Sequence, residues 1–138
     1  MEPTDDLRRR GLIKKFPPEP GAVENAMALA RRDATVAGTM LAGNADWAYT
    51  IAYNAMLQAG RALMFSKGYR PAGTNQHIAV VRFTELYLDR EAVLAFDRMR
   101  RKRHITVYDM AGTVSEGEAR NAVARAEAFL ETVEGLLA

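Results

Sequence analysis

The amino-acid sequence predicts an all-α protein, an antiparallel up-and-down bundle of four to five helices preceded by a short N-terminal helix. Apolar residues recur at steps of three and four in several long segments, as they do on one face of a helix. No segment alternates apolar and polar residues between hairpin turns, so no strand is expected. The connections are short, which places consecutive helices antiparallel. A length of 138 residues suits a single core.

The first expected element is a short helix within residues 1–16. Thr4 is its predicted cap, the two acidic residues that follow suit the positive helix end, and the arginines at 8–10 suit the negative end. Three prolines and a glycine between residues 17 and 21 then end the helix. We therefore divide the chain into an N-terminal arm, residues 1–21, with a short helix and a proline-rich break, and a helical bundle, residues 22–138.

The first long helix is expected from Ala22 to about Leu41. Its apolar stripe consists of Val23, Met27, Ala30, Ala34, Ala37 and Leu41. Asp46 is the predicted cap of a second helix, which runs to about Lys67 and ends at Gly68.

This second helix is apolar on nearly every side, which is typical of the centre of a bundle. Trp47 and Phe65, near its two ends, are expected in the core. One polar strip remains, and it carries Thr50, Asn54, Gln58 and Arg61. An amide midway along an apolar helix needs partners, so Asn54 is equally consistent with a structural role and with a place in a functional site.

A third, shorter helix is expected over residues 74–88, with Ile78, Val81 and Leu86 in the core. Asp89 is the predicted cap of a fourth helix that ends near Met110.

The last helix has the clearest signature. Ser115 and Glu118 have the spacing of a capping box. The apolar residues after them keep steps of four and three: Ala119, Val123, Ala126, Leu130, Val133 and Leu137.

Composition excludes several classes of site. The chain has no cysteine and two histidines, so we expect no metal site and no disulfide. Its glycines lack the spacing of a phosphate-binding loop, and no cofactor is expected. No apolar run is long enough for a membrane helix or a signal peptide, which favours a cytoplasmic protein without membrane contact.

Positive charge is concentrated in "FDRMRRKRHITVYD", residues 96–109, although the formal net charge is only +2. Arg100 and Arg103 lie on the same helical stripe as Phe96, Val107 and Met110, which are core-type residues. A guanidinium cannot be buried without partners, so these arginines either reach outward or line a cleft that holds anions. A solvated helix end is the alternative. The candidate phosphate-binding residues are Arg100, Arg101 and Arg103.

His104 and Tyr108 are neighbours on one helix face, with Arg101 a turn earlier. An imidazole, a phenol and guanidinium groups could together serve acid–base chemistry on a phosphodiester. The other histidine, His77, is interpreted as a helix-start or packing residue.

Four segments in order resemble the HEPN domain family over roughly residues 22–137. They are "DWAYTIAYNAMLQAGRALMFSKGYRP", "GTNQHIAVVRF", "FDRMRRKRHITVYD" and "VSEGEARNAVARAEAFLETVEGLL". The resemblance implies a helical bundle, usually a homodimer, with a functional groove at or near the dimer interface. Many members are metal-independent endoribonucleases, often toxins encoded beside a nucleotidyltransferase antitoxin, and others bind RNA or nucleotides without cleavage.

The ribonuclease motif of the family is an arginine, a polar residue, a few further residues and a catalytic histidine. By resemblance Arg103 is the arginine and His104 the polar residue, which leaves Tyr108 at the place of the catalytic histidine. A phenol, with an ordinary pKa of about 10, is a weak general base at neutral pH. In an alternative register Arg98 is the arginine and His104 the histidine, with a methionine where a polar residue belongs. Asn54 matches the polar residue that family ribonucleases place opposite the motif.

The resemblance thus favours a HEPN bundle that binds RNA or a nucleotide through a degenerate ribonuclease motif, and a place within a toxin–antitoxin pair is compatible with it. An active metal-independent endoribonuclease is one alternative, and a helical partner of a nucleotidyltransferase is another.

Overall fold

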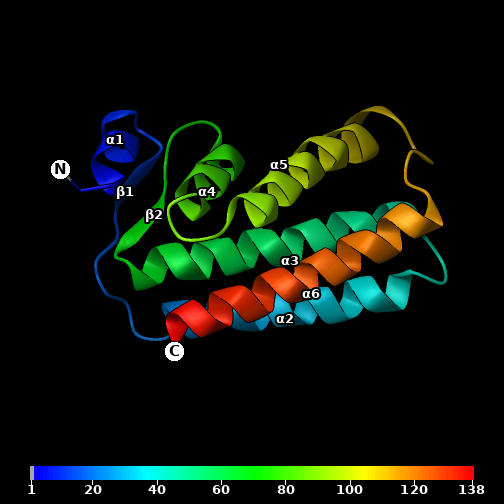
Figure 1. Cartoon of the computed structure of the whole chain (residues 1–138), viewed down its shortest axis with the longest axis horizontal. Coiled ribbons are helices and arrows are strands. Elements are labelled where there is room, and N and C mark those ends of the chain that lie inside the picture. Colours follow the sequence, from blue (N-terminus) through cyan, green and yellow to red (C-terminus); the bar gives the residue numbers. More distant parts are fainter. Residues whose placement is uncertain (1) are drawn as a thin grey trace.

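The structure, a computed structural model, describes residues 2–138 and confirms the all-α fold. In chain order the elements are α1 (Thr4–Arg9), β1 (Ile13–Lys15), α2 (Ala22–Met40), α3 (Ala45–Ser66), β2 (Tyr69–Pro71), α4 (Gln76–Thr84), α5 (Arg90–His104), the π-helix η1 (Ile105–Asp109) and α6 (Glu116–Leu137). The four long helices are α2, α3, α5 and α6, and each of the last three runs opposite to the long helix before it (Figure 1).

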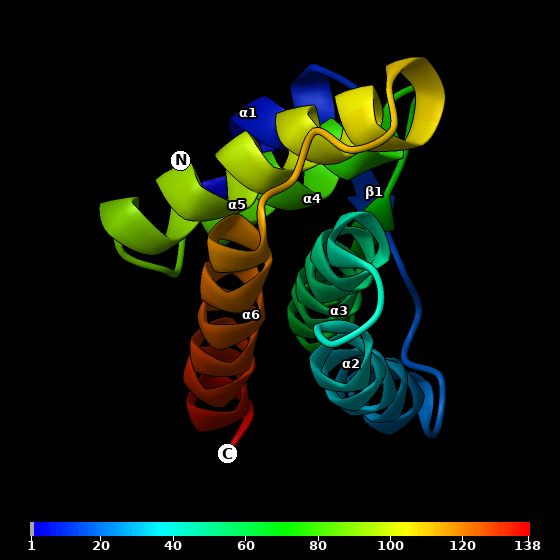
Figure 2. The same ribbon diagram turned by 90° about the vertical axis from the view of Figure 1, so that its right-hand side faces the viewer.

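Helix α3 is the centre of the bundle, as its sequence predicts. Figure 2 shows α4 and α5 above α3, with α2 below it and α6 beside it. Its side chains are therefore buried on several sides at once. Tyr53 of α3 packs on Phe96 of α5, with ring centroids 5.7 Å apart, and Phe96 packs on Phe129 of α6 at 5.0 Å. These aromatic contacts join three helices in one core.

The first and last long helices follow the sequence closely. Along α2 the middle of the predicted stripe is buried, and Val23 and Leu41 are partly buried at its ends. Helix α6 begins with the predicted capping box between Ser115 and Glu118. Its apolar stripe is buried except for Leu137, which is partly buried against the core.

The predicted cap of α3 was wrong. Asn44 accepts the hydrogen bond from the Trp47 amide at 3.0 Å, so α3 begins at Ala45. The Asp46 carboxylate instead accepts from the amides of Gly112, at 2.6 Å, and Val114, at 3.3 Å, and ties the segment before α6 to α3.

Trp47 was expected in the core but is 53% exposed, because an apolar pattern does not show whether the first turn of a helix is covered.

The N-terminal arm differs from the expectation in three ways. The predicted helix over residues 1–16, whose first residue lies outside the described part, is helical only from Thr4 to Arg9. Thr4 does not cap it; its hydroxyl lies 3.0 Å from the hydroxyl of Tyr69. Residues 13–15 form β1, which pairs antiparallel with β2 in the register Ile13↔Pro71. These strands are three residues long, too short for an alternating pattern to reveal.

The short helix α4 also ends earlier than predicted. Asn75 caps it by accepting from the Ile78 amide at 3.1 Å. Val81 is buried as expected and Ile78 is partly buried, but Leu86 lies beyond the helix and is exposed.

Helix α5 begins as predicted, with Asp89 accepting from the Ala92 amide at 2.8 Å. Its α-helical hydrogen bonding stops at His104, and a π-helix follows in which the Met110 amide bonds the Ile105 carbonyl at 2.9 Å. The predicted apolar stripe of this helix was drawn for 3.6 residues per turn. The wider π-helical turn therefore rotates the residues after His104 away from the buried face. Val107 and Met110, expected in the core, are 38% and 63% exposed.

Among the helices of residues 2–138, none combines the length and apolar character that a bilayer crossing requires.

Gly60 of α3 gives a stability test. A Cβ atom at this position would lie 2.5 Å from Cγ1 of Val80 and 3.4 Å from Cγ2 of Thr84, both on α4. Gly60→Ala should therefore lower the free energy of unfolding by about 1–3 kcal/mol, because overpacking outweighs the gain in helix propensity. Urea unfolding measures this loss.

Gly135→Ala in α6 is the matched control, because nothing lies within 4 Å of a Cβ there. It should leave stability unchanged or raise it slightly. Equal stability of Gly60→Ala and Gly135→Ala would contradict the tight α3–α4 contact.

Candidate functional site

A pocket of about 620 Å³ lies between the start of α4 and the end of α5. We call it the basic pocket. Its lining residues come from the α4 cap and first turn, from α5 and from η1: Asn75, His77, Arg100, Arg101, Arg103, His104 and Tyr108.

The buried face of α5 sets the positions of the arginines. Phe96 is fully buried and Met99 nearly so, which fixes the rotation of α5 on the core. The residues that follow, 100–104, are all partly or fully exposed. Arg100 is only partly exposed, and Arg103 is partly buried a turn later. The amphipathic pattern of α5 thus brings the three predicted phosphate-binding arginines to one pocket.

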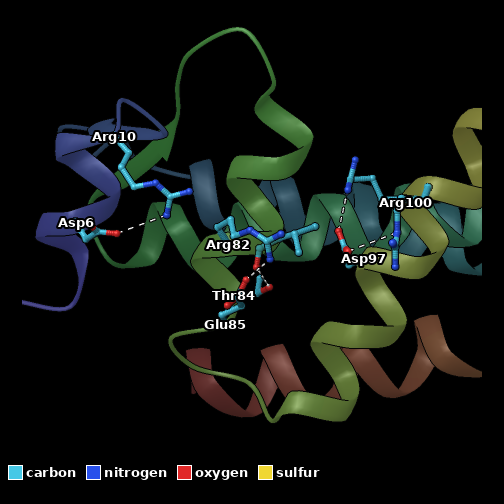
Figure 3. Close-up of polar contacts among 9 residues, drawn as sticks. Asp6, Arg10, Arg82, Thr84, Glu85, Asp97 and Arg100 are labelled. Atoms are coloured by element: carbon cyan, nitrogen blue, oxygen red, sulfur yellow. Dashed lines mark hydrogen bonds and ion pairs between the residues drawn. The ribbon is translucent and has the colours of Figure 1, made fainter.

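Asp97 binds two of these arginines. Its Oδ1 lies 3.0 Å from both Nε and Nη2 of Arg100, and its Oδ2 lies 3.6 Å from Nε of Arg101. Figure 3 shows Arg100 and Asp97 facing each other along α5. The paired contact orients the Arg100 guanidinium, and one carboxylate charge is shared between two guanidinium groups.

Arg103 forms no ion pair within residues 2–138. Its guanidinium carbon lies 5.5 Å from the centre of the Tyr108 ring, a cation–π contact. The ring of Tyr108 is also 5.0 Å from that of His104, tilted by 46°. The π-helix η1 carries Tyr108, so the local break in α-helical geometry positions the aromatic side of the pocket.

His77 belongs to the pocket, although the sequence analysis assigned it only a packing role. It lies in the first turn of α4, and its Nδ1 is 2.8 Å from the hydroxyl of Tyr53. The two rings stack with centroids 5.7 Å apart. One signal for this pair was present in the sequence, because a tyrosine in the bulky stripe of a central helix needs a hydrogen-bond partner.

The surroundings shift the titration of both residues. Burial lowers the pKa of His77, and the positive charges of Arg103, Arg100 and Arg61 lower it further. Burial raises the pKa of Tyr53 far above its ordinary value, although Arg103 and Arg100 oppose the rise. At neutral pH the pair is therefore a neutral imidazole and a protonated phenol.

Two residues from the sequence-based site lie elsewhere. Asn54 donates a 2.7 Å hydrogen bond to Oδ2 of Asp33 on α2, whose other carboxylate oxygen binds Arg32. Arg98 does not line the basic pocket. It lies near Tyr49 instead, whose pKa is raised to about 12 by burial and by the charge of Glu118, and the charge of Arg98 opposes this rise. The first motif register, with Arg103, His104 and Tyr108, is the one whose residues share the pocket.

Within residues 2–138, no group of three or more His, Cys, Asp or Glu side chains is placed to hold a metal ion.

Comparison with known proteins gives the following similarities. The family model described as "HEPN domain" matches residues 24–136. TT1696 from Thermus thermophilus has a similar fold, with a TM-score of 0.69 at 18% sequence identity over 83% of this chain and 98% of that one. ST0689, described as an archaeal HEPN homologue, gives a TM-score of 0.68 at 17% identity over 84% of this chain and 98% of its own. No curated protein is significantly similar in sequence.

Proposed function

The chain belongs to the HEPN domain family, and from this premise we propose that its basic pocket binds the phosphate groups of RNA or of a nucleotide. The observation that carries the proposal is the excess of positive charge in one cavity. Arg100, Arg101 and Arg103 line it, and the carboxylate of Asp97 offsets only one of their three charges. Anions are the complement of such a site.

The start of α4 adds to this preference. The amides of Gln76 and His77 belong to the first helical turn, where the helix itself offers them no carbonyl. Because Asn75 and His77 line the cavity, the positive end of the helix dipole lies at the same cavity as the arginines.

The aromatic side of the pocket fits the rest of a nucleotide. Tyr108 is 64% exposed and its ring adjoins that of His104. A base can stack on such a surface whatever its sequence, while the arginines bind the phosphate beside it.

Replacement of Arg103 tests the proposal. Arg103→Ala should weaken binding of a short single-stranded RNA roughly ten- to a hundredfold, because a charged hydrogen bond to phosphate contributes about 1.5–3 kcal/mol. The slope of log affinity against log salt should also fall by about 0.7, the contribution of one phosphate contact in a single strand. Fluorescence anisotropy at several salt concentrations measures both.

Arg120→Ala is the matched control, since Arg120 is an exposed arginine of α6 outside the pocket. It should retain wild-type affinity and salt dependence. Equal losses in the two variants would show that binding follows overall charge and would exclude a specific role for the pocket.

An active endoribonuclease is the second candidate, favoured by one observation. His104, which could act as a general acid or base, lines the same cavity as Arg103, which could stabilise a developing negative charge on phosphate. Tyr108 at the place of the family's catalytic histidine argues for binding without cleavage.

Cleavage of a mixed RNA pool in excess chelator separates the two candidates. We expect wild type and Tyr108→Phe to leave the RNA intact. Cleavage by wild type that is lost in His104→Ala and kept in Tyr108→Phe would instead establish the ribonuclease.

We further propose that two copies associate through exposed apolar residues beside the pocket, in keeping with the homodimers usual in the family. Val107 and Met110 are exposed next to Tyr108. The nucleotidyltransferase partner stays a prediction from the family resemblance.

Met110→Glu should convert the dimer to a monomer in light scattering, because it places a charge in the apolar contact. Leu94→Glu, an exposed position of α5 that does not line the basic pocket, should leave the mass unchanged. A monomeric wild type would reject the dimer.

A further inference from the structure

We propose that His77, held by the Tyr53 hydroxyl, is itself a ligand-binding residue whose Nε2–H donates a hydrogen bond to a phosphate oxygen in the basic pocket. This inference rests on the proposed function and deepens it. It assigns a phosphate-binding role to a pair of residues on α3 and α4 that lie outside the family's ribonuclease motif.

The hydrogen bond to Tyr53 fixes the orientation of the His77 imidazole. His77 lines the pocket, and its Nδ1 is 2.8 Å from the Tyr53 hydroxyl. The hydrogen bond to α3 occupies one ring nitrogen. Nε2, on the other edge of the ring, is left for a ligand.

The buried Tyr53 hydroxyl determines which nitrogen of the His77 imidazole carries the proton. Tyr53 is 1% exposed, and within residues 2–138 His77 is the hydrogen-bond partner of its hydroxyl. A buried hydroxyl proton needs an acceptor, and the raised pKa of Tyr53 keeps that proton in place. Tyr53 therefore donates to Nδ1, and the neutral imidazole carries its proton on Nε2. His77 faces the ligand as a donor.

Three arginines act electrostatically on the imidazole of His77. Arg61 on α3 and Arg100 and Arg103 on α5 disfavour a second proton, and their effect on the pKa of His77 adds to that of burial. The carboxylate of Asp97, which acts electrostatically on Tyr53, is bound to Arg100. Arg101, His104 and Tyr108 are the remaining titratable groups of the cavity.

A bound phosphate changes this balance. Its negative charge offsets the arginines and accepts from Nε2–H, so the pKa of His77 is higher in the complex than in the free protein. The complex then holds more protons than the free protein between those two pKa values. Linkage requires the affinity to rise as the pH falls through the pKa of the complex and to level off below the lowered pKa of the free protein.

The experiment measures the affinity of a tetramethylrhodamine-labelled 2′-O-methyl oligouridine between about pH 5 and about pH 8, the range in which histidine titrates. This probe cannot be cleaved through a 2′-hydroxyl, and it carries no terminal phosphate that would titrate in that range. The variants are His77→Gln, His77→Leu, Tyr53→Phe and His104→Gln.

We expect His77→Leu to lose about tenfold in affinity at neutral pH, because it removes a donor to a charged group. His77→Gln, whose amide can still donate, should keep most of the neutral-pH affinity but lose the part of the pH dependence that His77 causes. His104→Gln leaves His77 in place and should therefore keep the part of the pH dependence that His77 causes. Tyr53→Phe should weaken binding, because nothing then fixes the proton on Nε2.

Nitrogen-15 NMR of the imidazoles checks the tautomer directly. The His77 signal, assigned by its absence in His77→Gln, should report a proton on Nε2 in wild type and a mixture in Tyr53→Phe. This readout and circular dichroism also show whether each variant is folded.

A proton on Nδ1 in the free wild type, or equal affinity and pH profile in wild type and His77→Leu, would overturn the inference. If Arg103→Ala still weakened binding in that case, the proposed function would stand without it. Failure of wild type to bind the probe at any pH would remove both.

Discussion

Gly60 lets α4 lie directly on α3, and the position of the basic pocket depends on this contact. The absence of a side chain at Gly60 makes room for Val80. The same close approach of the two helices brings His77, one turn before Val80, within hydrogen-bond distance of Tyr53, about two turns before Gly60. The opposite wall, α5, is fixed by Phe96 between Tyr53 and Phe129. Two walls of the cavity, α4 and α5, are therefore each anchored on α3, and core packing sets their positions. The π-helix η1 adds the aromatic side.

The long helices were predictable because each has a sustained apolar stripe, and burial of such a stripe is what stabilises a helix in a bundle. The errors fall where that signal is short or changes its period. Asn44 and Asp46 are both good caps, and only the path of the chain decides between them. The π-helix widens the turn after His104, which no 3.6-residue pattern anticipates. Strands of three residues carry too little pattern to be seen.

The lining of the basic pocket was predictable in the part that lies on one helix. Arg100, Arg101, Arg103 and His104 are close in sequence, so helical geometry alone brings them together. Tyr53 and His77 are 24 residues apart and meet only because α4 folds back on α3. The side chain of Asn54 is oriented by its hydrogen bond to Asp33, a buried acid on another helix, and no local sequence pattern connects the two residues. Chemistry shared between helices is thus the part that one sequence reveals least.

The pairing of β1 with β2 has a consequence for synthesis of the chain. Between these strands lie all of α2 and α3, so β1 leaves the ribosome long before its partner does. The helical hairpin of α2 and α3 forms from local contacts and shortens the gap that the strands must close. Until then Ile13, which is buried in the final fold, is exposed on an unpaired edge next to two lysines. Lys14 and Lys15 are the kind of residue that keeps such an edge from pairing with the wrong chain.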